Sequence, residues 1–285
     1  MTRRRKPRLQ LALAAWLIAL IAAVAMPSRA GAEDLSARAM DVWGRFGVGS
    51  WKQTRIVSEA LDDAGKVTST SSTDVRTTIT KVDRTHVTLK INVTVEAGGK
   101  RYDAEPQVVQ HGYYGEGPNQ VVRLRDLGKS DVTVDGIAYP CLLREAGIDV
   151  GRQKTVLKLF ESAGQAPYVL RRETTFADAG NPAADYQETS EITLLDMPYK
   201  IHSDMKTVAL EHTVQKSDKG TTVTADITCV EVPGAIVIRS QKELDSRGHI
   251  TRRSTVELTD YSAVEEDQSD NFRPRLFHRR RAARQ

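Results

Sequence analysis

The stretch Leu244-Asp245-Ser246-Arg247-Gly248-His249-Ile250-Thr251 has the residues of a tight β-hairpin. An Asp side chain accepts hydrogen bonds from nearby backbone N–H groups, and Gly adopts a positive φ without a Cβ clash. The pattern Asp-x-x-Gly therefore predicts a chain reversal between two strands. The same pattern occurs at Leu61-Asp62-Asp63-Ala64-Gly65-Lys66-Val67-Thr68.

A longer order of residues leads into the first of these turns. The pattern consists of two apolar residues, an Arg, an apolar residue and a Gly. It occurs with identical spacing in Val237-Ile238-Arg239…Leu244…Gly248 and in Val169-Leu170-Arg171…Phe176…Gly180. The recurrence predicts a duplicated set of hairpins, with related halves at about residues 50–150 and 151–262. We expect Arg171 and Arg239 to lie on the solvent-facing side of their strands.

Apolar and polar residues alternate along much of the chain after residue 50. The clearest case is residues 87–96, in which Val87, Leu89, Ile91, Val93 and Val95 alternate with polar side chains. One buried face and one wet face are typical of antiparallel sheets. Residues 66–80 are rich in Thr and Ser, which favours an edge strand or a strand solvated on both faces.

A helix is predicted only near the start of the mature chain. Leu35, Ala39, Trp43 and Phe46 recur at helical spacing within Glu33–Phe46, and we expect Trp43 and Phe46 to pack on the sheet. The predicted fold class is therefore mainly β. It is an antiparallel, strongly curved sheet or incomplete barrel built from two related β-hairpin units, with one short N-terminal helix.

The first 32 residues have the three parts of a secretory signal peptide. A basic stretch from Arg3 to Arg8 precedes an apolar run from Leu9 to Met26, and Ala30-Gly31-Ala32 is a small-x-small cleavage site. We expect cleavage before Glu33, with an uncleaved anchor as the alternative. The mature protein is thus predicted to be exported to the periplasm or the extracellular space, with no transmembrane domain.

Removal of this segment changes the charge of the protein. Residues 1–32 hold six basic residues and no acidic one, so the formal net charge of +4 becomes −2 without them. Six more positive charges lie in the last 13 residues, at Arg273, Arg275, Arg279, Arg280, Arg281 and Arg284. We expect an acidic β domain over residues 33–262 and a disordered Arg-rich tail over residues 263–285, which contacts an anionic surface or an acidic protein.

The mature chain contains two cysteines, Cys141 and Cys229. Each ends or lies within an alternating apolar pattern, Ile137-Tyr139-Cys141-Leu143 and Val223-Ala225-Ile227-Cys229, so both thiols are expected to face a core. A pair of cysteines in an exported protein is consistent with a disulfide. Two separate buried thiols are the alternative.

Aromatic residues mark the candidate binding site. Gln107–Asn119 is rich in Gly and Tyr and is expected to be a loop. Trp51, Tyr113 and Tyr114 are the residues predicted to contact a ligand at the rim of the sheet. The alternative is that Tyr113 and Tyr114 cover the open end of the sheet.

No local motif for catalysis or metal binding is present. The six histidines have no His-x-x-x-His spacing and no Cys-x-x-Cys companion, and there is no Gly-x-Ser-x-Gly, Walker or Gly-x-Gly-x-x-Gly motif in the required context. We therefore expect no catalytic residue, no metal, no cofactor and no specific nucleic-acid partner.

Two short segments carry a family resemblance. Val134-Asp135-Gly136-Ile137-Ala138-Tyr139-Pro140-Cys141 and Cys229-Val230-Glu231-Val232-Pro233-Gly234-Ala235-Ile236-Val237 resemble a pattern in uncharacterised exported β proteins of bacteria such as planctomycetes. The order of a leading helix and a long antiparallel meander is also similar to the lipoprotein carriers of the LolA and LolB type. That resemblance implies an incomplete barrel around an apolar cavity.

These observations predict a non-enzymatic binding protein of the cell envelope. One apolar face of a curved sheet needs a cover, and the sequence has one good helix, so an apolar or lipidic ligand is the first hypothesis. The alternative is a structural or interaction module that the basic tail tethers to an anionic surface.

Overall fold

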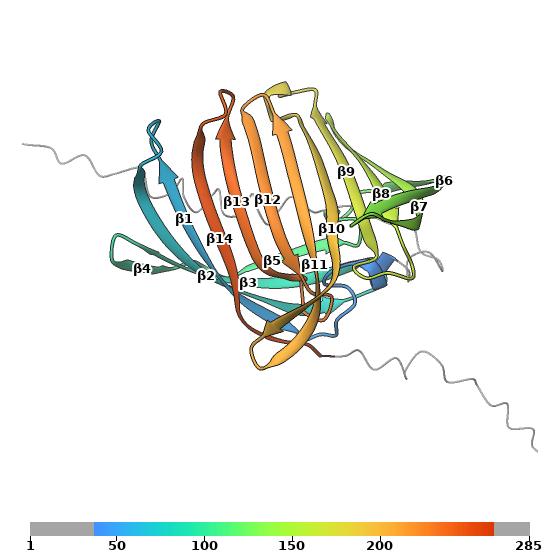
Figure 1. Ribbon diagram of the computed structural model, residues 1–285, viewed down its shortest axis with the longest axis horizontal. Helices are drawn as coiled ribbons and strands as arrows, with labels where there is room; N and C mark the ends of the chain where they lie inside the picture. Colours follow the sequence, from blue (N-terminus) through green and yellow to red (C-terminus); the bar gives the residue numbers. More distant parts are fainter. Residues whose placement is uncertain (1–36, 265–285) are drawn as a thin grey trace, which may run out of the picture.

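The computed structural model describes residues 37–264, and these form one antiparallel sheet of fourteen strands (Figure 1). The predicted mainly β fold, an antiparallel curved sheet with one short N-terminal helix, is confirmed. The strands are β1 (Trp51–Leu61), β2 (Val67–Val82), β3 (His86–Ala97), β4 (Lys100–Asp103), β5 (Gln107–Gly112), β6 (Val122–Val134), β7 (Ile137–Val150), β8 (Gln153–Glu161), β9 (Val169–Asp178), β10 (Tyr186–Ile201), β11 (Asp204–Ser217), β12 (Gly220–Thr228), β13 (Ile236–Asp245) and β14 (Ile250–Ser262). A 3₁₀ turn, η1 (Pro182–Ala184), lies between β9 and β10.

The order of the strands is β4-β3-β2-β1-β14-β13-β12-β11-β10-β9-β8-β7-β6, with β5 also paired to β3. The first strand therefore lies in the middle of the sheet beside the last. The free edges are β4 with β5 on one side and β6 on the other. Laid flat, thirteen strands would separate these edges by roughly 58 Å.

The chain itself limits how far apart the two edges lie. Residues 113–121 run directly from the end of β5 to the start of β6. Ten peptide steps span at most roughly 35 Å. The sheet therefore curls toward closure, and this segment bridges the remaining gap, which we call the seam.

Two of the three predicted hairpin turns have the same structure. Asp62 Oδ1 accepts hydrogen bonds from the N–H groups of Ala64 and Lys66, at 3.0 and 2.9 Å. Asp245 Oδ1 accepts the equivalent bonds from Arg247 and His249, at 2.8 and 2.9 Å. Gly65 and Gly248 have φ values of +78° and +87°. The turn chemistry predicted from Asp-x-x-Gly is thus confirmed for β1–β2 and β13–β14.

The third turn differs from the other two. Asp178 Oδ1 accepts a hydrogen bond from Gly180 N–H at 2.8 Å, but the connection from β9 continues through η1 before β10 begins. Gly180 is also absent from the residues with positive φ in the described part of the chain. The spacing of the sequence pattern is therefore shared, whereas the turn is not.

The Ser- and Thr-rich strand β2 is not an edge strand. It pairs with β1 and β3, and its second half buries Thr73, Val75, Thr77 and Ile79. Only the half next to the Asp62 turn is exposed on both faces. The edge prediction was wrong because Thr also fits a buried face when its neighbours in the sheet cover it.

The predicted N-terminal helix is shorter than expected. Residues 37–40 are helical, and residues 33–36 lie outside the described part. Asp41 Oδ1 accepts hydrogen bonds from the N–H groups of Trp43 and Gly44, which turns the chain out of the helix. Trp43 and Phe46 still pack on the sheet, against Val75, Ile79, Val87, Leu89 and Ile91.

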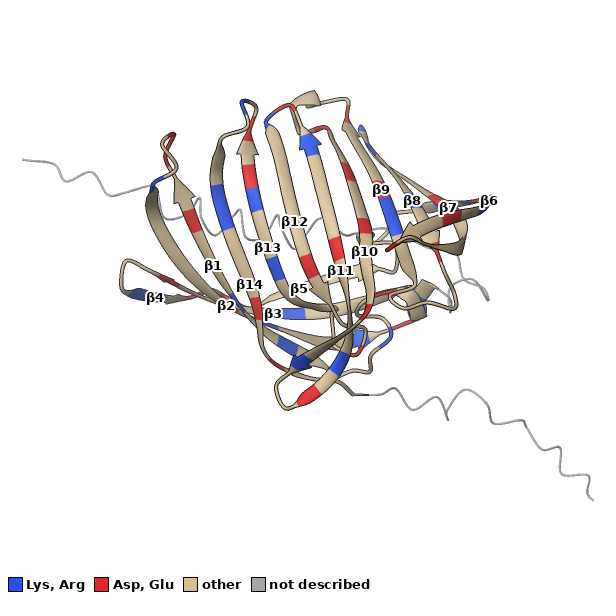
Figure 2. Cartoon of the chain, in the orientation of Figure 1, with Lys and Arg blue, Asp and Glu red and all other residues tan. Residues whose placement is uncertain are grey.

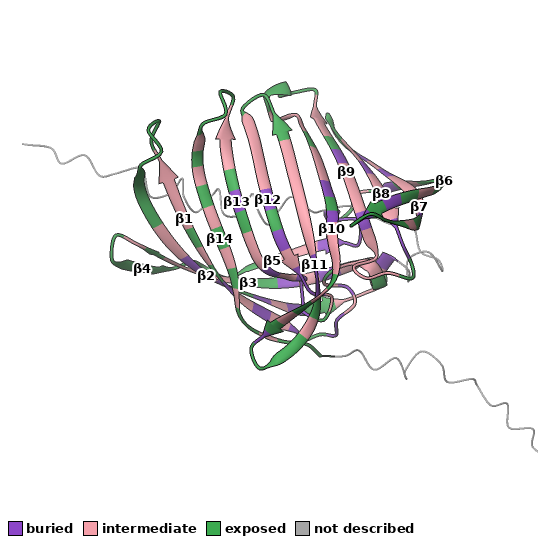
Figure 3. Cartoon of the chain, in the orientation of Figure 1, coloured by how far each residue is buried: buried purple, intermediate pink, exposed green. Residues whose placement is uncertain are grey.

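We call the face that receives Trp43 and Phe46 the inner face of the sheet. It carries separate apolar clusters rather than one continuous core. One cluster joins Tyr113 and Tyr114 to Ala146, Leu157 and Leu159 on β7 and β8, and another is the Phe46 cluster on β2 and β3. Burial along the central strands between them is mostly intermediate (Figure 3).

Candidate functional site

An unbroken row of polar residues crosses the inner face between the two apolar clusters. Cross-strand partners in a sheet share a face, so the register identifies which side chains lie together. From β9 through β14 to β2, successive partners are Arg172, Ser190, Thr213, Thr224, Gln241, Ser254, Ser58 and Ser71. We call these eight residues the polar row.

Both ends of the polar row are tied to the inner face. Arg172 is the partner of Leu159, which packs with Tyr113 and Tyr114. Ser58 lies two residues after Ile56, which packs against the Phe46 cluster. Side chains alternate between faces along a strand, so the whole row lies on the inner face.

A second polar row runs beside the first. Its partners are Thr174, Glu188, Gln215, Thr222, Glu243 and Arg252, on strands β9 to β14. The neighbouring residues on the other face are more exposed, for example Glu191, Ala225, Ser240 and Thr255. Within the polar row, Ser190, Thr224 and Gln241 are only 2%, 7% and 6% exposed. The polar residues therefore lie on the more enclosed, concave side of the sheet.

Ion pairs lie within, between and beside the two rows. Arg239 of β13 makes two hydrogen bonds to Asp226 of β12, at 2.8 and 2.6 Å, and the Asp226 side chain is 3% exposed. Arg172 contacts Glu188 at 3.3 Å, and Arg252 contacts Glu243 at 3.6 Å. Both signs of charge are spread over these central strands (Figure 2). The inner face is thus polar and close to charge-balanced.

A buried lysine adjoins the Arg239–Asp226 pair. Lys52 Nζ donates a hydrogen bond to Gly234 O at 3.1 Å and lies 5.3 Å from the ring centre of Trp43. The pKa of Lys52 is lowered to about 7, chiefly by burial and also by the charge of Arg239, while the charge of Asp226 opposes the shift. The ammonium of Lys52 is thus in balance with the neutral amine near neutral pH.

Asp226 also changes the pKa of Arg239, its direct ion-pair partner. Burial alone would lower the pKa of Arg239, but the hydrogen bonds and charge of Asp226 raise it overall. Arg239 therefore stays charged on the inner face. The expectation that Arg239 lies on the wet face was wrong, because pairing with Asp226 compensates its burial.

Arg171 occupies the other face. Its neighbour Arg172 points inward, and side chains alternate along a strand, so Arg171 points outward. There it contacts Glu173 at 2.7 Å and lies 5.5 Å from the ring of Phe160. The two arginines of the sequence pattern are therefore on opposite faces of the sheet.

The three aromatic residues predicted to contact a ligand are not brought together. Tyr113 and Tyr114 are buried, at 7% and 6% exposure, and pack on β7 and β8. Trp51 lies on the outer face of β1, where Arg76 stacks on its ring at 3.7 Å. Tyr113 and Tyr114 thus have the covering position that the alternative reading described, and their contact with a ligand stays a prediction.

The two thiols are buried but not bridged. Cys141 packs with Val132, Val134 and Leu170, whereas Cys229 packs with Val208, Val232 and Val237. Cys229 directly follows β12, and Ile227 of that strand packs against the same cluster. Of the two alternatives, the structure has the separate buried thiols, and burial raises the pKa of both.

Two cavities among the described residues are lined by mixed polar and apolar groups. One of about 440 Å³ lies between β6 and β8–β10 and includes Asp131, Phe160, Arg171 and Glu191. The other, of about 600 Å³, lies at the end of the sheet and includes Arg45, His202, Lys206, Glu231 and Tyr261. Neither has the apolar lining that an acyl chain requires.

The remaining predictions concern metals, membrane segments and the termini. Residues 37–264 contain no group of three or more His, Cys, Asp or Glu side chains placed to hold a metal ion. No helix in the same part of the chain is long and apolar enough to cross a membrane. The signal peptide and the arginines of the tail lie outside the described residues.

Comparisons with known proteins yield only distant structural similarity. No protein-family model and no curated protein matches the sequence. A candidate exported protein with a YmcC-like fold from Bacteroides fragilis is 10% identical, with a TM-score of 0.31 over 76% of this chain and 99% of that one. A candidate lipoprotein from Parabacteroides distasonis is 9% identical, with a TM-score of 0.32 over 78% and 98%. A DUF1329 family protein from Desulfovibrio piger is 10% identical, with a TM-score of 0.35 over 81% and 90%.

Proposed function

We propose that the chain is an exported, non-enzymatic binding protein that holds a polar ligand against the inner face of its curved sheet. The observation that carries this proposal is the polar row, which continues without an apolar residue across eight strands. Buried hydroxyl and amide groups are costly unless they are hydrogen-bonded. Ser190 Oγ donates to Glu211 and Gln241 Nε2 to Glu243. A polar surface of this kind favours a ligand with hydroxyl or charged groups.

The guanidinium group of Arg172 supports a polar ligand further. Among the described residues its Nε is buried and has no hydrogen-bond partner, although the same side chain contacts Glu188. An unsatisfied donor at the end of the polar row favours a ligand or water that accepts a hydrogen bond there. The apolar or lipidic ligand of the first hypothesis has less support, because protein side chains already cover the apolar parts of the inner face.

Native mass spectrometry tests ligand binding directly. The protein is recovered without detergent from the exterior of the cells that produce it, and its native mass is compared with the mass of the denatured chain. We expect an excess mass that is lost on denaturation. A native mass equal to that of the bare chain contradicts the proposal.

Matched variants assign the site to one face. Thr224→Val with Gln241→Met removes a hydroxyl and an amide from the inner face at nearly constant volume. Ser240→Ala with Thr255→Val makes a similar change on the outer face, at positions next to the polar row. We expect only the inner-face pair to abolish the excess mass. Binding of the dye 1-anilinonaphthalene-8-sulfonate by the native protein would instead favour the apolar ligand.

A specific observation supports a second function, a module tethered to an anionic surface. Gly47 N–H donates to Val264 O at 2.8 Å, so the last described residue is bound to the folded domain and the six arginines follow it at a short distance in sequence. Deletion of residues 273–285 is expected to abolish retention on heparin at low salt. Unchanged retention contradicts tethering.

A further inference from the structure

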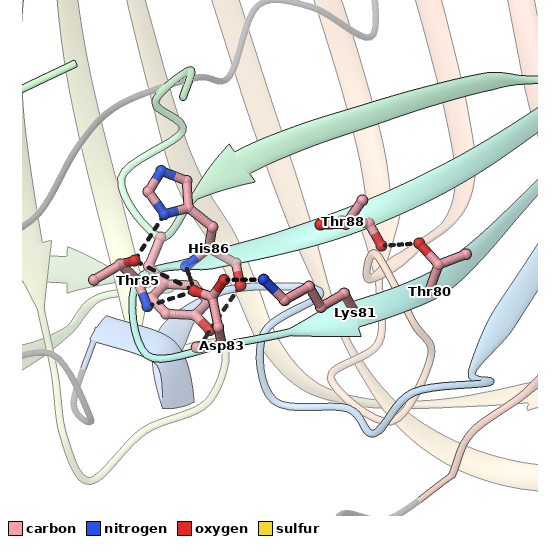
Figure 4. A network of polar contacts seen from close by, with 7 residues as sticks. Thr80, Lys81, Asp83, Thr85, His86 and Thr88 are labelled. Carbon is pink, nitrogen blue, oxygen red and sulfur yellow. Dashed lines mark hydrogen bonds and ion pairs between the residues drawn. The ribbon is translucent and has the colours of Figure 1, made fainter. Parts of the chain in front are cut away.

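The seam segment, residues 113–121, contacts the strands at both free edges of the sheet. Tyr113 and Tyr114 belong to one apolar cluster with Val122 of β6. Gly112, the last residue of β5, donates its N–H to Glu116 O at 2.8 Å. Tyr113 and Tyr114 pack against the β7–β8 side. Tyr113 Oη donates a hydrogen bond to Asp83 O at 2.5 Å, in the turn between β2 and β3. Figure 4 shows this turn, in which Asp83 Oδ1 accepts hydrogen bonds from the N–H groups of Thr85 and His86. The seam segment therefore holds the two edges together.

Glu116 lies at the centre of the seam segment and is fully buried. Its Oε2 accepts a hydrogen bond from Tyr114 N–H at 2.8 Å, and its Oε1 has no partner among the described residues. The carboxyl group lies directly against Gly112, where an added Cβ would be 1.7 Å from Glu116 Cδ. The backbone also closes around it, because Gly112 N–H donates to Glu116 O at 2.8 Å. The Glu116 side chain therefore has no solvent-exposed surface in the closed seam.

Other titratable groups lie on the elements around the seam. Asp41 comes from the N-terminal segment, His111 from β5, and Asp83 and His86 from the β2–β3 turn. On the β7–β8 side, Arg144 contacts Glu161 at 3.4 Å and donates to Tyr114 Oη at 3.3 Å. Of these groups, the Asp41 carboxylate acts on Glu116, and its negative charge raises the pKa of Glu116.

This environment favours the neutral carboxyl. The pKa of Glu116 is raised to about 9, chiefly by burial and also by the charge of Asp41, while the hydrogen bond from Tyr114 N–H opposes the shift. Burial likewise raises the pKa of Asp41, with His111 opposing. Burial lowers the pKa of His86, so this ring is neutral at and above neutral pH.

We propose that the seam segment is a gate between the β5 and β6 edges of the sheet, closed by the buried, protonated Glu116 carboxyl and opened when that group loses its proton. Opening lets water solvate the carboxylate, which the closed seam excludes. The gate is a local change and leaves the pairing of the central strands intact.

The direction of the pH dependence follows from the proton balance. Between the ordinary pKa of Glu116 and its raised value in the closed seam, the closed state binds one more proton than the open state. The closed state is therefore favoured at low pH and is progressively lost as pH rises toward about 9. The limiting change is about tenfold in the opening equilibrium for each pH unit. Above pH 7 the ring of His86 no longer contributes.

Hydrogen exchange measured by mass spectrometry between pH 7 and 9 tests the gate. Rates are corrected for the intrinsic pH dependence of amide exchange. We expect the protection of peptides covering residues 107–125 to fall several-fold to about tenfold per pH unit. Peptides from β12 and β13 serve as an internal reference and keep their protection.

Three variants decide which group is responsible. In Glu116→Gln the carboxyl becomes a neutral amide of the same shape, and the fall in protection with pH is expected to disappear. Glu105→Gln, at an exposed position between β4 and β5, is expected to behave as the original chain does. If the fall in protection with pH persists in Glu116→Gln but disappears in Asp41→Asn, the role of Glu116 is overturned. If β12 and β13 lose protection equally, the gate is not local.

The outcome is independent of ligand binding. Exchange reports the gate in the chain alone, whereas native mass reports the ligand. A pH-dependent seam without a bound ligand leaves the gate and contradicts the proposed function. A bound ligand with a pH-independent seam does the reverse.

Discussion

Gly234 lies where the N-terminal segment meets the turn between β12 and β13. Its φ is +71°, its N–H donates to Val42 O at 2.9 Å, and its carbonyl accepts the bond from Lys52. A Cβ at this position would lie 2.4 Å from Cζ2 of Trp43 and 2.8 Å from Lys52 Nζ. Glycine is therefore required here by conformation and by close approach together.

Substitution of Gly234 separates the cost of the positive φ from the cost of the close approach to Trp43. Gly234→Ala is expected to lower the free energy of unfolding by about 2–4 kcal/mol, measured by urea denaturation, because the indole ring of Trp43 must move. Gly99→Ala is the matched control, since Gly99 has a φ of +72° and nothing within 4 Å of an added Cβ. The control is expected to cost about 1 kcal/mol. Equal costs would mean that Trp43 is not packed on Gly234.

At the scale of elements, alternation within a strand and register between strands decide where charges lie. β9 and β13 share a sequence pattern and a length of 10 residues, yet their arginines point to opposite faces. Arg239 pairs with the 3% exposed Asp226, whereas the side chain of Arg171 is 41% exposed. Only the inner pair is enclosed.

Replacement of each arginine tests this assignment. Arg239→Met leaves a buried carboxylate without its partner and is expected to cost about 3–5 kcal/mol of unfolding free energy. Arg171→Met removes an exposed ion pair and is expected to cost less than about 1 kcal/mol. Adding Asp226→Asn to Arg239→Met is expected to restore much of the loss, because no charge is left unpaired. Similar losses for the two single variants would place both arginines on the same kind of surface.

At the scale of the whole molecule, one curved sheet joins parts of the chain that are far apart in sequence. β1 pairs with β14, although almost the whole sequence of the domain separates them. Residues 51–61 therefore have both of their neighbouring strands only when residues 250–262 are in place. The two thiols lie in different apolar clusters of that sheet. Their reactivity therefore reports the integrity of separate regions.

Thiol alkylation with mass detection checks this arrangement. In the native protein without reductant, neither Cys141 nor Cys229 is expected to react, because both are buried and burial raises the pKa of both thiols. In denaturant without reductant, both are expected to be alkylated. A denatured chain that takes up no alkyl group until reductant is added would show a disulfide and contradict the unbridged arrangement.

The turns and the alternating strands were predictable because their causes are local. The carboxylate of Asp62 or Asp245 bonds to backbone N–H groups within four residues, and Gly65 and Gly248 supply the positive φ of the turn. The candidate site was only partly predictable. Trp51, Tyr113 and Tyr114 were identified by residue type, but their separation across the two faces and the seam depends on strand order.

The sequence by itself determined that the chain is an antiparallel β protein with hairpins at particular residues, since side-chain period and turn chemistry act over a few residues. Only the tertiary structure decided that the enclosed face is the polar one. Thr213 is followed by Val214, and Thr224 follows Val223. The alternation alone does not say whether the Thr side chains or the Val side chains face inward. The register across β9–β14 and the curvature of the sheet place Thr213 and Thr224 on the inner face. Charged and hydroxyl groups on that face hydrogen-bond to one another, and the seam segment covers the apolar residues of β7 and β8.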